Sequence, residues 1–326
     1  MTRRTTRTFT VGAALAVSGL ALAACSDSTG SGGGGDSADF PEDDVTLIVQ
    51  ADAGGGSDLT SRALATELEP VLGVSIVVEN RPGASGSTAM QYVAGEEPDG
   101  YTIGFSPVEI SMLGHEGYDV DPADYDFLGQ IMLAPGVLVV PADSPYDTLE
   151  DFVEAGQDQS LSVANSGAGS IWEIAAFGLA DATGAQLDPV PFDGGAPALA
   201  AAVGGQVDAA VAGAGEVSAA VDDGQVKALA VFHDEPYPDL PDVPTAADAG
   251  YEDLEFGGWG GIYAPAGLPD DVRSTLESGI EEAATSEGFE DTVTKSGNLV
   301  VYKSADEFTD FVNSEYDRFG TLLGNG

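Results

Sequence analysis

The chain has few residues that could cross-link it or bind a metal: one cysteine, Cys25, and two histidines in 326 residues. A single cysteine excludes an internal disulfide, so packing alone must hold the fold. The histidines, His115 and His233, have no partners at metal-ligand or catalytic spacing, and we expect both on the surface or in turns. The sequence therefore predicts neither a metal site nor a cofactor.

Positive charge is also scarce, because 10 Lys and Arg stand against 55 Asp and Glu, for a formal net charge of −45. Such a surface repels nucleic acid and anionic lipid headgroups, so we expect neither as a partner. The acids are scattered through apolar segments rather than gathered in a tail. We interpret this as adaptation to high salt, which screens self-repulsion; a plainly acidic exported protein is the alternative.

Long hydrophobic runs are missing after residue 25, where no stretch is apolar over the roughly 20 residues that a membrane-spanning helix requires. The one long apolar run, 9–23, follows Arg3, Arg4 and Arg7, an arrangement typical of a secretory signal. We therefore predict a signal peptide over 1–24. Arg3 and Arg4 leave open whether export follows the general or the twin-arginine route.

The residues Leu22-Ala23-Ala24-Cys25 resemble a bacterial lipoprotein processing box. The resemblance implies cleavage before Cys25 and a lipid on its sulfur. A flexible tether rich in Gly and Ser then follows within 25–42. An ordinary signal followed by an unpaired thiol is the alternative. With the lipid, the mature chain would be held at the outer face of the cytoplasmic membrane by that anchor alone.

Short β-branched runs alternate with Ala- and Leu-rich stretches of helical period, which is typical of an α/β fold with largely parallel strands. The runs predict strands at 45–50, 75–79, 102–105, 137–140, 161–164, 188–191, 207–212, 227–232, 261–263 and 299–302. Apolar side chains spaced three and four apart predict a first helix over 59–72, ended by Gly73. Further helices are predicted at 171–182, 270–287 and 305–322. In the first of these, Ser170 and Glu173 match a capping box and Gly184 a stop.

Two strand–loop–helix units share one design. In the first, a loop containing Gly54-Gly55-Gly56 leads into a helix from Ser57; in the second, a loop from Asn165 to Gly169 leads into a helix from Ser170. The first amides of a helix have no partners and carry partial positive charge, so each loop can seat an anion without Lys or Arg. Either loop by itself is equally an ordinary tight turn. Neither matches a dinucleotide or phosphate-loop motif.

Eight motifs in order carry a resemblance to a known family: 45–58, 77–86, 98–102, 165–170, 194–199, 204–208, 240–245 and 263–267. From residue 43 to the C-terminus, the chain resembles the substrate-binding receptors of tripartite tricarboxylate transporters, often called Bug receptors. The resemblance implies a type II periplasmic-binding-protein fold of two lobes hinged by two crossing strands, near 137–140 and 257–263. Lobe 1 would comprise 43–137 plus 257–326 and lobe 2 138–256.

The resemblance also implies a function. The protein would capture a small carboxylate (a tricarboxylate, a dicarboxylate or an acidic amino acid) between its lobes. It would deliver this ligand, as a monomer and without catalysis, to integral membrane permease subunits. The ligand residues carried over from the family are Ala53, Gly54, Gly55, Gly56, Ser57, Asp58, Gly167, Ala168, Gly169, Ser170, Phe192, Asp193, Gly194 and Asp208. Ser106 lies just beyond the end of a predicted strand and is a further candidate contact. Trp172 opens the second helix and is a further candidate, and Asp208 is alternatively an acceptor for a nearby loop.

The sequence departs from the family pattern at Asp52, Asp193 and Glu173, where uncharged, basic and histidine residues are usual. Each carboxylate either points outward or meets a cationic part of the ligand, and the second case favours an amine-bearing ligand over citrate.

Two other functions stay open at this stage. A sensor subunit for a membrane signalling protein would share the same fold and ligand. An exported hydrolase is the other, although no G-x-S-x-G elbow is present.

Overall fold

The computed structural model describes residues 40–252 and 254–324. The predicted signal peptide, the lipidation site Cys25 and the tether up to residue 39 lie outside the described residues. The described residues all belong to one unit, Ala38–Gly326.

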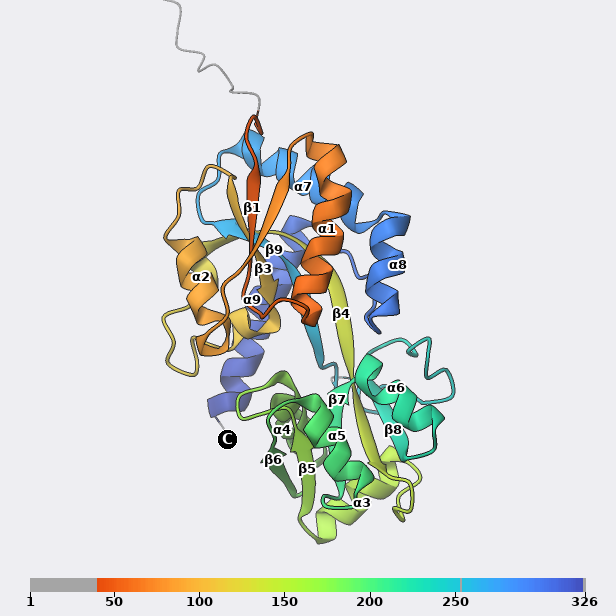
Figure 1. The fold of residues 1–326 in the computed structure, drawn as a ribbon. Helices are drawn as coiled ribbons and strands as arrows, with labels where there is room; N and C mark the ends of the chain where they lie inside the picture. Colours follow the sequence, from red (N-terminus) through yellow and green to blue (C-terminus); the bar gives the residue numbers. More distant parts are fainter. Residues whose placement is uncertain (1–39, 253, 325–326) are drawn as a thin grey trace, which may run out of the picture. The chain divides into compact units, whose positions relative to one another are not determined.

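The elements follow one another as in Figure 1. The strands are β1 (Val45–Val49), β2 (Ile76–Asn80), β3 (Thr102–Pro107), β4 (Tyr125–Pro141), β5 (Leu161–Asn165), β6 (Leu187–Pro191), β7 (Ala209–Gly213), β8 (Val226–Phe232) and β9 (Gly257–Pro265). The α-helices are α1 (Gly56–Leu72), α2 (Ser87–Ala94), α3 (Leu149–Asp158), α4 (Ile171–Thr183), α5 (Gly195–Val203), α6 (Ala214–Asp222), α7 (Asp270–Ala284), α8 (Glu287–Lys295) and α9 (Ala305–Gly324). Short 3₁₀ turns are η1 (Ala84–Gly86), η2 (Val108–Ser111) and η3 (Pro122–Asp124).

The sheet order is β2-β1-β3-β9-β4-β7-β5-β6, with β8 also paired to β4. In lobe 1, which holds β1–β3, α1, α2, α7 and α8, strand β1 is parallel to β2 and β3. In lobe 2, which holds β5–β8 and α3–α6, strand β5 is parallel to β6 and β7. Each lobe is thus built from strand–helix–strand units, whose loops open at the carboxyl ends of the strands.

Two strands join the lobes. Residues 125–135 of β4 pair antiparallel with β9, and residues 136–141 pair with β8. Figure 1 shows β4 running from one lobe into the other. At the crossing, Gly136 N donates to Phe256 O at 2.8 Å, just before β9 begins. The α/β fold of two lobes with two hinge-crossing strands is therefore confirmed, while the predicted residue limits of the lobes stay a prediction.

Separate apolar clusters support the lobes and the hinge. Leu47, Leu64, Leu68 and Ile280 are buried where α1 and α7 cover the lobe 1 sheet. The C-terminal helix α9 packs along β4 and also contacts α4. Its Phe308 ring meets Trp259 of β9 edge to face at 5.6 Å. The hinge is thus backed by an aromatic layer that ties the C-terminus to both lobes.

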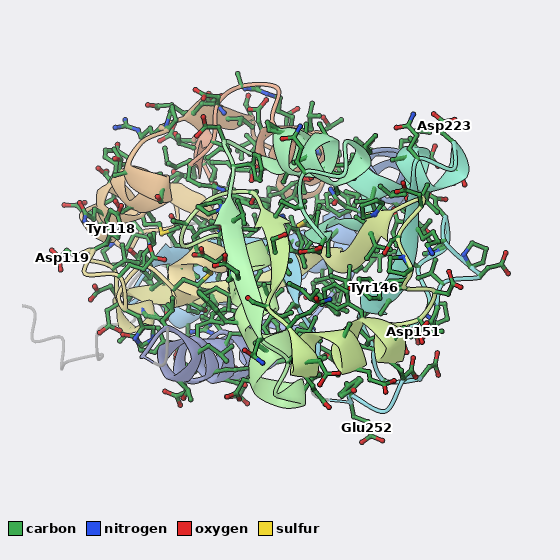
Figure 2. All side chains as sticks on the ribbon, turned by 90° about the horizontal axis from the view of Figure 1, so that it is seen from below. Tyr118, Asp119, Tyr146, Asp151, Asp223 and Glu252 are labelled. Atoms are coloured by element: carbon green, nitrogen blue, oxygen red, sulfur yellow. The ribbon has the colours of Figure 1, made fainter. Side chains whose placement is uncertain are left out.

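Acidic side chains populate the surface. Figure 2 shows the carboxylates of Asp119, Asp151, Asp223 and Glu252 at the periphery, and all four residues are exposed. They come from four separate segments, as expected from the scattered acids in the sequence.

Several predicted elements differ from the structure. Strand β4 is 17 residues long, although only 137–140 was predicted, because Gly129, Pro135 and Gly136 interrupt the apolar pattern. The predicted strand 299–302 is wrong: Leu299 and Lys303 form isolated bridges to β4 only. The predicted helix 270–287 is two helices, because Ser286 Oγ caps α8 by accepting from Phe289 N. Helices α2, α3, α5 and α6 were not predicted; they are short, at 8 to 10 residues.

Candidate functional site

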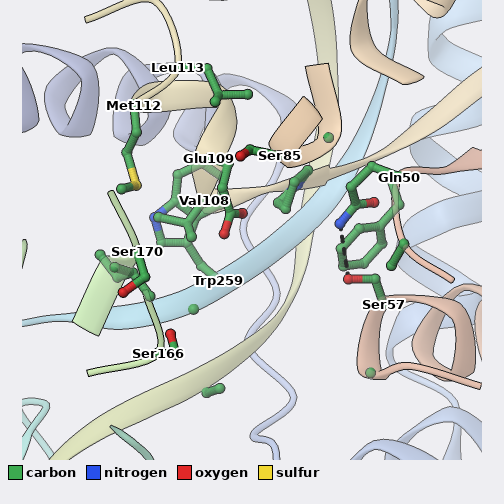
Figure 3. Close-up of a pocket in the computed structure, with 18 of the residues that line it drawn as sticks. Gln50, Ser57, Ser85, Val108, Glu109, Met112, Leu113, Ser166, Ser170 and Trp259 are labelled. Atoms are coloured by element: carbon green, nitrogen blue, oxygen red, sulfur yellow. Dashed lines mark hydrogen bonds between the residues drawn. The ribbon is translucent and has the colours of Figure 1, made fainter. Parts of the chain in front are cut away.

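A cleft of about 680 Å³ lies between the lobes. Lobe 1 contributes the β1–α1 loop, the loop at residues 82–86 and the segment from Phe105 to Glu116. Lobe 2 contributes the β5–α4 loop from Ser166 to Ile171. Met132 and Ala134 of β4 and Gly258 and Trp259 of β9 also line it, so the hinge strands form one wall (Figure 3).

The lobe 1 loop is organised around Asp58. Its side chain is 2 % exposed, accepts from Gly54 N at 2.8 Å and from Asn80 Nδ2 at 2.9 Å, and receives Arg62 Nε at 3.0 Å. The hydrogen bond from Arg62 is the main reason that the pKa of Asp58 falls from 3.8 to about 2. Asp58 therefore fixes the shape of the loop from outside the cleft lining, while Gly56 and Ser57 line the cleft.

The lobe 2 loop is organised around the start of α4. Ser170 Oγ accepts from Glu173 N at 3.3 Å, which confirms Ser170 as the cap. Glu173 completes no capping box with Ser170, because its Oε2 accepts instead from Gly169 N at 2.6 Å. Gly167 and Gly169 have φ of 136° and 75°, so this tight approach to α4 requires glycine at both positions.

The cleft thus holds two helix N-termini of opposite lobes. Their unpaired first-turn amides and partial positive charge suit an anionic group. No Lys, Arg or His is among the described residues that line the cleft. Ser57 accepts a hydrogen bond from Gln50 Nε2 at 3.0 Å, which orients its hydroxyl beside these amides.

Six of the predicted ligand residues line the cleft: Gly56, Ser57, Gly167, Ala168, Gly169 and Ser170. Ten do not: Ala53, Gly54, Gly55, Asp58, Ser106, Trp172, Phe192, Asp193, Gly194 and Asp208. A ligand role for any of these residues stays a prediction.

The structure gives several of the ten residues a local role. Asp208 accepts from Ser162 N at 2.8 Å, as the alternative reading of this residue anticipated. Ser106 is fully buried where β3 pairs with β9. Trp172 is buried in the lobe 2 core beside Gly136 and Gly213.

The structure also shows where the three acids that depart from the family pattern lie. Asp52 lines the cleft and is exposed, and Asp193 is exposed and outside the cleft lining. Glu173 is half-buried and committed to Gly169. Of these three, only Asp52 lies where a bound solute would meet it.

Sequence reasoning missed Glu109 and Glu116 in the cleft lining. Burial raises the pKa of both carboxyls; the charge of Glu116 adds to the rise at Glu109, and the charge of Glu173 adds to the rise at Glu116. Glu109 follows β3 by two residues, and the carboxyl end of a central parallel strand faces the ligand crevice in open α/β sheets. The position of Glu109 just after this strand could have identified it as a residue of the cleft.

Within residues 40–252 and 254–324, no group of three or more His, Cys, Asp or Glu is arranged to hold a metal ion. In the same residues, no helix has the length and apolar character that crossing a bilayer demands.

Comparison with known proteins gives a consistent result. The profile of the "Tripartite tricarboxylate transporter family receptor" matches residues 60–325. A ligand-free TctC solute binding protein from Polaromonas superposes with a TM-score of 0.83 at 27% identity, covering 88% of this chain and 100% of that chain.

Two solved receptors carry ligands. MatC from Rhodopseudomonas palustris, with bound malate, has a TM-score of 0.69 at 28% identity and covers 87% of this chain and 100% of that one. Rpa4515 from R. palustris, with adipate, has a TM-score of 0.72 at 26% identity and covers 87% and 98%. The chain therefore belongs to the receptor family of the tripartite tricarboxylate transporters, a family of solute-binding proteins and not of enzymes.

Proposed function

We propose that this extracytoplasmic receptor captures a small carboxylate between its lobes and delivers it to the membrane subunits of a tripartite tricarboxylate transporter. The observation that carries the proposal is the cleft itself. The N-termini of α1 and α4 open on one space, and none of the described residues that line it has a cationic side chain. The malate and adipate complexes of two relatives support a carboxylate as the ligand class.

Main-chain amides supply enough binding energy for this task. A helix N-terminus contributes about 0.3–1 kcal/mol to an anion in solvent and up to ~2 kcal/mol when partly buried. Each hydrogen bond to a charged group adds about 1.5–3 kcal/mol. Two such termini with several amide contacts therefore reach the roughly 8 kcal/mol that micromolar affinity requires.

Closure follows from the hinge. A ligand that touches both lobes favours the conformation in which they approach, and β4 with β9 are the connections that can bend. The glycine pairs Gly257-Gly258 and Gly260-Gly261 place little side-chain bulk on β9 at this point. Ligand capture then presents a closed receptor to its transporter.

The membrane side of the proposal rests on the sequence before residue 40. A lipid on Cys25 would keep the receptor beside the permease, with the following Gly- and Ser-rich residues as tether. Cys25→Ser should release the protein into the medium, and retention of that variant at the membrane would contradict the anchor.

The ligand site is tested by placing a charge in it. Gly56 begins α1, and a Cβ built there meets nothing within 4 Å, so Gly56→Asp should fold and set a carboxylate against the proposed seat. We expect malate, or whichever carboxylate binds best, to lose at least about tenfold in affinity by titration calorimetry, because one lost charge-assisted contact is of that size.

The matched control is Gly95→Asp, which adds the same charge after α2, outside the cleft lining, where a Cβ makes only ordinary contacts. Equal affinity of Gly56→Asp and the unchanged protein would contradict the amide seat. The absence of binding by any small carboxylate would contradict the function.

A further inference from the structure

The connection between β2 and α2 has an unusual backbone. Gly83, Ala84, Ser85 and Gly86 have φ values of 135°, 49°, 55° and 96°, so four consecutive residues adopt positive φ. Gly86 N donates to Gly83 O at 2.9 Å and closes a turn over 83–86. Glycine adopts such φ values freely, whereas the Cβ of any other residue crowds its own following carbonyl oxygen. Among the described residues, Ala84 and Ser85 are the two non-glycine residues with positive φ.

The structure on both sides holds this turn in its strained conformation. Before the turn, Arg81 N donates to Val49 O of β1 at 2.7 Å, and the Arg81 guanidinium carbon lies 3.5 Å from the centre of the Tyr92 ring of α2. After it, Gly86 is buried, and a Cβ built there would come within 3.0 Å of Gln50 Cγ. Strained residues persist only where their surroundings over-determine them, and they cluster at ligand-binding sites.

The strained turn forms part of the cleft wall. Ser85 lines the cleft and Ala84 does not, and Figure 3 shows Ser85 among the lining side chains. The Gln50 side chain packs against Gly86, and its Nε2 donates to Ser57 Oγ at 3.0 Å. Ser57 and the turn that presents Ser85 therefore contact the same glutamine side chain. A solute held at Ser57 would extend along the wall that contains Ser85.

The Ser85 side chain suits a polar group of a solute. The residue is exposed, so its hydroxyl is accessible from the cleft. A hydroxyl both donates and accepts hydrogen bonds, and it can therefore meet a hydroxyl group of the solute in either role. Because the turn is already fixed, little conformational freedom is lost when that contact forms. Glycine at this position would relieve the strain and would also remove the hydroxyl.

We propose that Ser85 is a further specificity-determining residue of the cleft, whose hydroxyl binds a hydroxyl group on the solute near the carboxylate that Gly56 and Ser57 hold. This inference rests on the proposed function and narrows it. A hydroxylated acid then binds in preference to the plain acid of the same skeleton. The strained backbone keeps the Ser85 hydroxyl in place before the solute arrives.

The first test compares acids that differ only by a hydroxyl. L-malate and succinate form one such pair, and citrate and propane-1,2,3-tricarboxylate form the other. Titration calorimetry of the purified protein should show the hydroxylated member of at least one pair binding about three- to tenfold more tightly, as one additional hydrogen bond implies. Ser85→Ala keeps the strained backbone and removes the hydroxyl, so it should abolish that preference and leave the affinity for the plain acid unchanged.

Ala84 provides the matched control, because it shares the positive φ of Ser85 but lies outside the cleft lining. Ser85→Gly and Ala84→Gly both relieve strain, so each should melt at the same temperature as the unaltered protein or a few degrees above it. Ser85→Gly should lose the preference for the hydroxylated acid, whereas Ala84→Gly should retain it. This difference separates a contact made by the Ser85 side chain from an effect of the backbone.

The outcomes separate the two proposals. Equal affinities within both pairs, or tighter binding of the plain acids, overturn this inference and leave the carboxylate receptor intact. A preference that survives in Ser85→Ala, or that is lost equally in Ala84→Gly and Ser85→Gly, overturns the assignment to the Ser85 hydroxyl. Binding of another small carboxylate but none of these four acids overturns the inference alone. Binding of no small carboxylate overturns the proposed function.

Discussion

At the scale of single residues, the chain uses its own carboxylates to shape both loops of the cleft. The carboxylate of Asp58 accepts a hydrogen bond from Gly54 N, and that of Glu173 accepts one from Gly169 N, each within its own lobe. Both carboxylates thus bind backbone amides next to the proposed anion-binding helix N-termini. The shape of each loop therefore depends on a charged side chain of the protein itself. Asp58 is the better fixed of the two, because Arg62 and Asn80 also hold it.

Asp58→Asn should destabilise the protein by roughly 1–2 kcal/mol at pH 6, a value reduced for the solvent around the half-exposed Arg62. The pKa of Asp58 is lower in the folded protein, about 2, than its ordinary 3.8. Its contribution is therefore complete above pH ~4 and lost as pH falls toward about 2. Urea unfolding at pH 6, 4 and 3 measures this.

The control for this variant is Asp44→Asn, which removes an exposed carboxylate just before β1 and should change stability little. A difference between Asp58→Asn and the parent that stays constant from pH 6 to pH 3 would contradict the charged network.

Sequence patterns predicted the local signals well at this scale. Gly73 and Gly184 adopt left-handed φ values of 76° and 73° and end α1 and α4, as their positions indicate. Glu109 and Glu116 could not be singled out, because a net charge of −45 places acids everywhere and gives no sign of which side chains turn inward. Glu116, for example, contacts Gly169 of the other lobe, and a contact between residues so distant in sequence leaves no local pattern.

At the scale of elements, the glycines of β9 allow close packing at the hinge in addition to backbone flexibility. A Cβ on Gly261 would collide with the Gly129 carbonyl oxygen and the Phe308 ring, whereas a Cβ on Gly258 would lie 3.8 Å from Ala134 Cβ. Gly257 and Gly260 are enclosed as tightly as Gly261, so Gly258 is the one glycine of β9 with room for a side chain.

Gly261→Ala should cost about 1–3 kcal/mol and lower the melting temperature by several degrees, because neither the backbone of β4 nor the ring of α9 can move cheaply. Gly258→Ala should leave the melting temperature within about one degree. Differential scanning calorimetry of the pair tests the packing of the hinge, and equal melting temperatures for both variants would refute it.

Helices and strands were predicted correctly where the apolar residues follow a regular period, and they were missed where that period is interrupted. Strand β1 begins at Val45 and β8 ends at Phe232, as their β-branched runs indicate. Helices α5 and α6 are short and rich in Ala and Gly, so their apolar face is not visible against a uniformly apolar stretch. The length of β4 depends on pairing with β9 across a large sequence separation, which local pattern does not report.

At the scale of the whole molecule, the ordered motifs from residue 43 onward pointed to the family that the profile match over 60–325 shows. The same motifs placed two glycine loops at one cleft, and Gly56 and Gly169 both line it. Glu109 and Glu116, which also line the cleft, lie between those motifs. Family resemblance therefore predicts the fold and the two loops, and the three-dimensional structure is needed to identify the other side chains that line the cleft.

The central claim is that main-chain amides of opposed helix N-termini, rather than basic side chains, hold the solute's carboxylate. A crystal structure of the protein with its tightest-binding small carboxylate tests this most directly. The account predicts that a carboxylate oxygen of the ligand lies within hydrogen-bond distance of the amide of Gly56 or Ser57, directly or through one water, inside the cleft. A ligand bound outside the cleft, or held by the side chain of an Arg or Lys, would contradict it.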